Sequence, residues 1–185
     1  MAKYSLDKDS RRIYEQRADR WKEVVKESDS DIIKLSDTEQ YALNQYLSFE
    51  SYGMNEKLRK GLELNDMEKE MLHSLDSALR KIPKYEGNLS RSLYFGNEQS
   101  VKEFVKIFES NDIVPFREFI STTSSRKLYN PDGEVQIFIY NSKRGRNLSG
   151  FNVKEAEVLY ERNSEFRVVK IVNINGKYHI TLEEA

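Results

Sequence analysis

The spacing of apolar residues changes near Pro83, and this change constrains the fold more than any other feature of the sequence. Before it, Met67, Met71 and Leu75 recur at steps of four, which is the spacing of one buried helix face. After it come short runs rich in β-branched and aromatic residues, which are typical of strands. Helices first and antiparallel strands later predict an α+β fold rather than alternating βαβ units.

Polar residues mark where the helices begin. Ser36-Asp37-Thr38-Glu39 is a capping-box sequence, in which Ser36 caps the backbone and Glu39 reaches back to it. Residues 51–61 predict a turn and a short helix that ends at Gly61, and residues 65–68 begin a further helix.

The second half of the chain predicts a series of strands. We expect strands at residues 89–95, 117–123, 134–140, 155–160, 166–174 and 177–182, with one helix around residues 101–108. Asn175-Gly176, between the last two strands, is a strong signal for a two-residue hairpin turn. The charged, glycine-containing stretch 142–150 is expected to be an exposed loop.

The N-terminal segment differs from the rest. Residues 1–30 form a charged extension in which Tyr14, Ala18, Trp21 and Val25 place one apolar stripe on a predicted helix. We expect this helix to dock on the body of the chain or on a partner. Residues 31–185 are long enough for a single domain with its own core.

Composition excludes several classes of function. The 30 basic and 31 acidic residues give a net charge near −1, which does not favour nucleic acid as a partner. No apolar run is long enough for membrane insertion, and no secretory signal is visible. The chain has no cysteine and only two histidines, so we predict no metal site and no cysteine nucleophile.

The acidic triplet Glu155-Ala156-Glu157 is the first candidate for chemistry. Two residues is the period of a strand, so both carboxylates are expected to point the same way. Two like charges held close together cost free energy unless a partner compensates them or a function uses them. On spacing alone, a solvated strand face is the commoner explanation, and an active site is the alternative.

Two further features precede the triplet. Ser121-Thr122-Thr123 ends an apolar run, where the hydroxyls either satisfy backbone groups or orient a carboxylate or a ribose. Arg91 lies within the expected strand 89–95 and needs an anionic partner, either a structural acid or a ligand phosphate.

In this order the three features resemble a known family. An arginine strand, a Ser-Thr-Ser strand and a Glu-x-Glu strand, preceded by helices, are the pattern of the arginine–serine–glutamate class of mono-ADP-ribosyltransferases. That class includes enzymatic subunits of bacterial binary toxins, effectors and phage proteins. The stretches ALNQY (42–46), SYGMNEKLR (51–59) and EAEVLYERNSEFRVV (155–169) are also similar to the family. The sequence departs from it in having Thr123 for the last serine and Arg91 in an S-R-S context.

The resemblance implies a fold and a division of roles. The fold is expected to hold two packed, mainly antiparallel sheets around a cleft for NAD, which is a substrate. Glu157 is then the catalytic carboxylate at the ribose, Ser121 holds it in place, and Arg91 binds the NAD phosphates. Glu155 positions the acceptor and takes its proton, and a glutamate at this place points to an arginine acceptor.

Other residues receive roles from the same resemblance. The expected NAD contacts beyond the catalytic set are Tyr46, Tyr52, Asn55, Thr122, Thr123 and Arg126. The loop from Asn141 to Lys154 is expected to recognise the target protein, and its Lys143, Arg144 and Arg146 indicate an acidic surface there.

The biological setting follows from the family. The target is a protein with an accessible arginine, with actin or a GTPase as candidates, and the N-terminal helix is expected to dock a delivery partner. Delivery into a host cell without a visible signal peptide is expected, or else a cytoplasmic location. The alternatives are an NAD glycohydrolase and a non-catalytic adaptor that keeps the fold.

Overall fold

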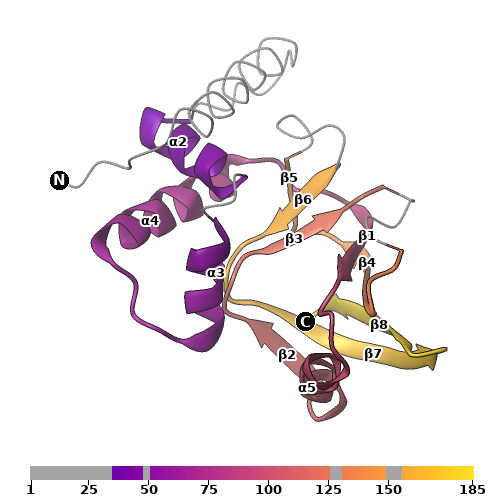
Figure 1. Ribbon diagram of the computed structural model, residues 1–185. Coiled ribbons are helices and arrows are strands. Elements are labelled where there is room, and N and C mark those ends of the chain that lie inside the picture. Colours follow the sequence, from indigo (N-terminus) through magenta and orange to yellow (C-terminus); the bar gives the residue numbers. More distant parts are fainter. Residues whose placement is uncertain (1–34, 48–50, 126–130, 149–155) are drawn as a thin grey trace. The chain divides into compact units, whose positions relative to one another are not determined.

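The computed structural model describes residues 35–47, 51–125, 131–148 and 156–185, without the side chains of residues 51 and 52. The chain divides into two compact units, Met1–Pro83 and Lys84–Ala185. The first is helical where it is described, and the second contains all eight strands that the described residues form (Figure 1). The boundary expected between residues 30 and 31 lies outside the described ranges.

Three helices make up the described part of the first unit: α2 (Asp37–Tyr46), α3 (Ser51–Lys60) and α4 (Asp66–Lys81). The predicted capping box at α2 is confirmed, because the Glu39 N–H donates to the Ser36 Oγ over 3.2 Å and the Ser36 N–H donates to the Glu39 Oε1 over 2.9 Å. Asn65 forms the same reciprocal pair with Glu68 at α4. The start of each of these two helices is therefore fixed by local sequence.

A buried carboxylate joins α2 to α4. Glu39 is only 4% exposed, and its carboxylate accepts from the Lys81 Nζ at 2.6 Å and from the Ser77 Oγ at 2.8 Å. Both donors lie on α4. The capping residue of one helix thus also holds the C-terminal turns of another.

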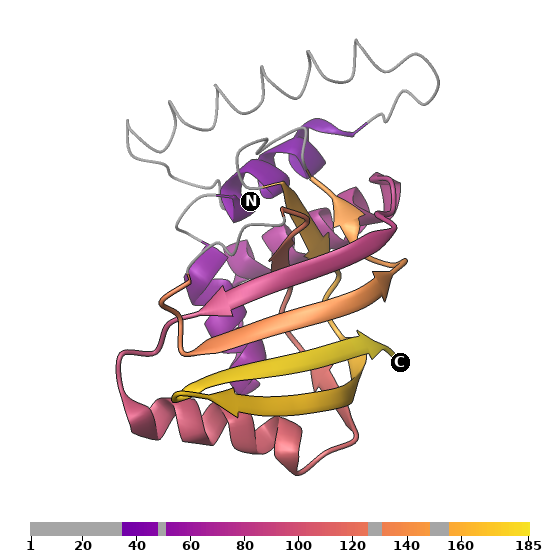
Figure 2. The same ribbon diagram turned by 90° about the vertical axis from the view of Figure 1, so that its right-hand side faces the viewer.

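The second unit is built on one eight-stranded sheet. Its strands are β1 (Gly87–Leu93), β2 (Ile113–Phe116), β3 (Ile120–Thr123), β4 (Val135–Ser142), β5 (Arg146–Asn147), β6 (Glu157–Tyr160), β7 (Ser164–Ile174) and β8 (Lys177–Glu184). The order across the sheet is β2-β7-β8-β4-β1-β3-β6-β5. Neighbouring strands are antiparallel except β4 and β8, and Figure 2 shows β1, β4, β8 and β7 side by side.

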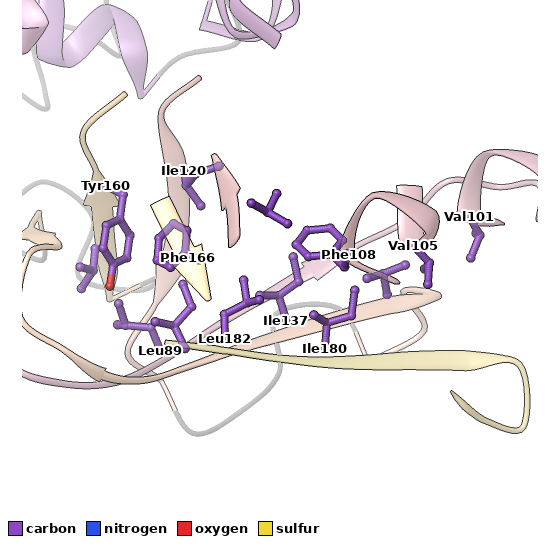
Figure 3. Close-up of a cluster of buried hydrophobic side chains, with 14 residues drawn as sticks. Leu89, Val101, Val105, Phe108, Ile120, Ile137, Tyr160, Phe166, Ile180 and Leu182 are labelled. Carbon is purple, nitrogen blue, oxygen red and sulfur yellow. The ribbon is translucent and has the colours of Figure 1, made fainter. Parts of the chain in front are cut away.

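The two sheets expected from the family are thus hydrogen-bonded into one, with β1 pairing with β3 at the junction. Apolar side chains of β1, β4 and β8 meet those of β3 and β6 in a single core, which Phe166 of β7 completes (Figure 3). Helix α5 (Glu98–Glu109) contributes Val101, Val105 and Phe108 to the same core. The prediction of an α+β fold is confirmed.

Most expected elements are present, although several begin or end a few residues from their expected positions. The predicted hairpin is confirmed, since Asn175 and Gly176 have φ values of 53° and 83°. Strand β2 was not expected, and β3 begins three residues later than predicted. Strand β6 begins at Glu157 rather than at residue 155. The stretch predicted as an exposed loop contains β5 and the buried Gly145.

Within the described ranges, no helix has the length and apolar content needed to cross a membrane.

Candidate functional site

Glu157, the candidate catalytic carboxylate, is the first residue of β6. Strand β6 pairs with β3, the hydroxyl-rich strand that carries Ser121, Thr122 and Thr123. Glu157 is directly opposite Thr123 of β3, and Thr123 is opposite Ser90 of β1. Directly opposed residues project from the same face of a sheet, so these three side chains form one row. Glu157 is 6% exposed, Thr123 7% and Ser90 8%, which places the carboxylate in a nearly dry environment.

Ser121 lies on the same face of the sheet as Glu157. Its opposite residue is Leu159, so Ser121 and Glu157 are diagonal neighbours across the β3–β6 pair. Diagonal neighbours in a sheet lie within reach of a long side chain. Ser90 could not be predicted from the sequence, because its place in the row depends on strand order and register.

Arg91 connects β1 to β3. Its Nη1 donates to the carbonyl oxygen of Ser121 over 2.9 Å, and the side chain is half-buried. The Arg91 side chain is therefore bonded to β3, the strand that carries Ser121, Thr122 and Thr123. This bond runs to the main chain of β3.

The hydroxyls of Thr122 and Thr123 also form hydrogen bonds with backbone groups. The Thr122 Oγ1 donates to the Val158 carbonyl over 2.7 Å, and the Thr123 Oγ1 accepts from the Ser125 N–H over 3.1 Å. These two bonds are therefore of the kind that is common at strand ends, where Ser and Thr hydroxyls satisfy backbone groups. It does not exclude a role at a site, since Thr123 also lies opposite Glu157.

The two acids were expected to share one face of a strand that begins at residue 155, but β6 begins only at Glu157. Ala156 has a φ of 45°, in the left-handed region, and lies in a turn before β6 begins. Side chains alternate only through extended residues, so the alternation of β6 does not continue through Ala156. Glu155 itself lies outside the described ranges.

Strand β6 ends at a buried tyrosine with two polar partners. The Tyr160 hydroxyl lies 2.7 Å from the Ser142 Oγ and donates to the Glu184 Oε1 over 2.8 Å. Burial, the strongest influence, raises the pKa of Tyr160 far above its usual range, and the Glu184 carboxylate adds to this effect. The hydroxyl therefore stays protonated and anchors β6 to β4 and β8.

In the helical unit, two expected NAD contacts touch each other. The Asn55 Nδ2 donates to the Tyr46 hydroxyl over 3.0 Å, which joins α3 to α2. Tyr46 is buried, at 4% exposure. The side chain of Tyr52 and all of Arg126 lie outside the described residues.

Two of the basic side chains expected to face a target protein, Arg144 and Arg146, interact with other groups of the same chain. Arg144 donates through Nη1 to the Ala185 carbonyl over 2.8 Å. The Arg146 Nη2 lies 3.8 Å from the Glu161 Oε2, and the Arg146 side chain is 13% exposed. Lys143 is exposed, although its N–H donates to Glu184. Residues 149–154 of the expected recognition loop lie outside the described ranges.

Comparison with solved structures identifies the fold. Exoenzyme S from Pseudomonas aeruginosa, solved with human 14-3-3 protein beta and carba-NAD, is 21% identical; 93% of this chain and 88% of that one are covered, with a TM-score of 0.64. The Clostridium limosum C3 exoenzyme is 16% identical, with 100% and 97% covered and a TM-score of 0.67.

The ADP-ribosyltransferase Vis from Vibrio splendidus has also been solved, in complex with agmatine. It is 18% identical, with 99% of this chain and 88% of that one covered and a TM-score of 0.63. At such identities these likenesses define the fold, which is that of the ADP-ribosyltransferases.

The sequence itself then gives the family. It matches the model of the ADP-ribosyltransferase exoenzyme family over residues 14–185, and the chain belongs to that family. No curated protein sequence matches it. The chain is thus an NAD-dependent ADP-ribosyltransferase of the group that supplies bacterial toxins and effectors.

Proposed function

We propose that this protein transfers ADP-ribose from NAD to an arginine side chain of a target protein and releases nicotinamide. The observation that carries the proposal is the burial of Glu157 at the start of β6, directly opposite the hydroxyl-rich strand β3. A carboxylate is the group that this reaction needs beside the ribose, and the family supplies NAD as the substrate.

Glu157 acts where positive charge develops. Cleavage of the bond between the ribose C1 and the nicotinamide nitrogen leaves an oxocarbenium-like ribose, and the bonding electron pair leaves with neutral nicotinamide. A carboxylate hydrogen-bonded to a ribose hydroxyl stabilises that charge, and low exposure strengthens the effect because little water screens it. The 6% exposure of Glu157 supports this role.

Arg91 and Ser121 hold the reactants in this proposal. A guanidinium has the planar donor geometry that suits phosphate oxygens, so Arg91 is assigned to the NAD phosphates. The same guanidinium bonds to the Ser121 carbonyl, which fixes its distance from β3. Ser121, a diagonal neighbour of Glu157, is assigned to orient the catalytic carboxylate.

Glu155 is assigned to the acceptor. Arginine is protonated at neutral pH, so a guanidinium nitrogen must lose a proton as it bonds to the ribose C1. A carboxylate both positions the guanidinium and accepts that proton, whereas an amide only positions it. The complex of Vis with agmatine, which carries the same guanidinium group as arginine, supports a guanidinium acceptor in this fold.

The target and the delivery route belong to the same proposal. We assign target recognition to the loop from Asn141 to Lys154, docking of a delivery partner to the helix predicted within residues 1–30, and the site of action to a host cell. Removal of residues 1–28 is expected to leave NAD hydrolysis intact. Loss of hydrolysis in the shortened chain would contradict a docking role.

The test measures nicotinamide release and labelling with radioactive NAD, with agmatine or a cell lysate as the acceptor. Wild-type protein should label both, and Glu157→Gln should abolish release. Glu109→Gln, at an exposed position of α5, is the matched control and should behave as wild type.

Glu155→Ala separates transfer from hydrolysis. It should abolish labelling while keeping much of the nicotinamide release into water. Equal loss of both activities would refute distinct roles for the two acids. Release without labelling by the wild type would indicate an NAD glycohydrolase, and no release at all would refute the enzymatic function.

A further inference from the structure

The turn before Glu157 has an unusual backbone. Among the described residues, four that are not glycine have a positive φ: Asn141, Ala156, Asn163 and Asn175. Asparagine tolerates the left-handed region because its short polar side chain bonds locally, whereas alanine has no such compensation. Ala156 is therefore the strained position in this group, and its neighbours must hold it there.

Ser124 supplies the restraint through two donors. Its N–H donates to the Ala156 carbonyl oxygen over 3.0 Å, and its Oγ donates to the same oxygen over 3.2 Å. These bonds follow directly on the Thr123–Glu157 pair and close the β3–β6 ladder. One carbonyl oxygen thus receives a main-chain and a side-chain bond from the same residue.

The next carbonyl along β6 is held from the opposite side. The Leu148 N–H donates to the Glu157 carbonyl oxygen over 2.8 Å. The main chain of Glu157 is therefore fixed by Ser124 through Ala156 on the β3 side and by Leu148 on the β5 side. The position from which the Glu157 side chain projects depends on both restraints.

We propose that Ser124 is a positioning residue for the catalytic carboxylate: its hydroxyl holds Ala156 in the left-handed turn from which Glu157 enters β6. This inference rests on the proposed function of Glu157. Misplacement of a catalytic group by a fraction of an ångström lowers a rate without preventing folding. The Ser124 N–H remains when the hydroxyl is removed, so the turn loosens but does not unfold.

The variants Ser124→Ala and Ser124→Thr test the hydroxyl. Ser124→Ala should lower kcat for nicotinamide release about tenfold, the rate equivalent of about one net hydrogen bond. KM for NAD should stay within about twofold, because Ser124 acts on the carboxylate and not on the phosphate contacts. Ser124→Thr keeps a hydroxyl and should restore most of kcat.

Ala156→Gly provides an independent check. Glycine adopts the left-handed region without strain, so the turn should depend less on its restraint. The loss of kcat caused by Ser124→Ala should then be smaller in the Ala156→Gly background than in the wild type. Ser110→Ala, at the exposed end of α5, is the matched serine control and should leave kcat unchanged.

The outcomes separate this inference from the proposed function. A wild-type chain that releases no nicotinamide refutes both. An active wild type with an equally active Ser124→Ala variant refutes the inference alone. An activity loss in Ser124→Ala that merely follows its folded fraction, measured by circular dichroism at the assay temperature, also refutes it, as does failure of Ser124→Thr to recover activity.

Discussion

Replacement of Glu39 by glutamine tests how the helical unit is held together. Burial on its own would raise the pKa of this carboxyl, but the Lys81 ammonium and hydrogen bonds from Ser36 and Ser77 lower it from 4.5 to about 2. Since the folded pKa lies below the unfolded one, the ionised carboxylate stabilises the fold above about pH 4.5. That contribution is lost as the pH falls toward 2.

The size of the effect follows from the pKa shift. The lowering of this pKa from 4.5 to about 2 corresponds to about 3 kcal/mol of unfolding free energy at pH 7, and less than half of it remains at pH 3. The carboxylate side chain is 5% exposed, so water screens it little, whereas Lys81 is 46% exposed. The exposure of Lys81 makes these figures upper values.

The assay is urea unfolding followed by circular dichroism at 222 nm, at several pH values from 7 down to 3. Wild-type and E39Q curves should be far apart at pH 7 and should converge as the pH falls. Glu56→Gln, which breaks the exposed Lys60 pair, is the control and should follow the wild type throughout. If the difference in unfolding free energy between wild type and E39Q did not change with pH, the electrostatic explanation would be refuted and packing would be the cause.

Three further predictions concern stability. Gly145→Ala places a Cβ 2.5 Å from the Val158 Cγ1 and should cost about 1–3 kcal/mol, seen as a lower Tm. Gly53→Ala adds a Cβ that, outside its own helix backbone and chain neighbours, meets no atom of the described residues within 4 Å. It should instead raise the Tm by stabilising its helix by about 1 kcal/mol; a fall would contradict this. Because burial and then Glu184 raise the pKa of Tyr160, wild-type stability should decline above about pH 10, the usual tyrosine pKa, in urea titrations. The Tyr160→Phe variant should lack that tyrosine-linked decline. If the unfolding free energies of wild type and variant fell in parallel above about pH 10, the prediction would be refuted.

The local sequence predicted those element ends that carry a capping or turn motif. The capping box at Ser36 and the Asn175-Gly176 turn each satisfy their own backbone groups, so short-range pattern was sufficient for both. Strand β2 was not predicted because Ile113–Phe116 is short and contains Pro115, which weakens the strand signal. The stretch 142–150 looked exposed because it is charged, yet Gly145 and Leu148 are buried beside β6.

The candidate site was predicted in its residue types but not in its geometry. The arginine, the hydroxyls and the acid were recognised from their order along the chain. The row of Ser90, Thr123 and Glu157 depends on β1 pairing with β3 and β3 with β6, which no local pattern specifies. The left-handed conformation of Ala156 could not be predicted either, because alanine carries no signal for it.

The position of β8 in the sheet sets the order in which the second unit can form. Every other described strand precedes β8 along the chain, yet β8 lies between β7 and β4 in the interior of the sheet. Its parallel pairing with β4 joins residues more than 40 positions apart, so loop closure must come before the pairing contributes. During synthesis, the segments already made therefore lack the strand that joins them. Until residues 177–184 form β8, strands β2 and β7 have no hydrogen-bonded link to the remaining strands of the sheet.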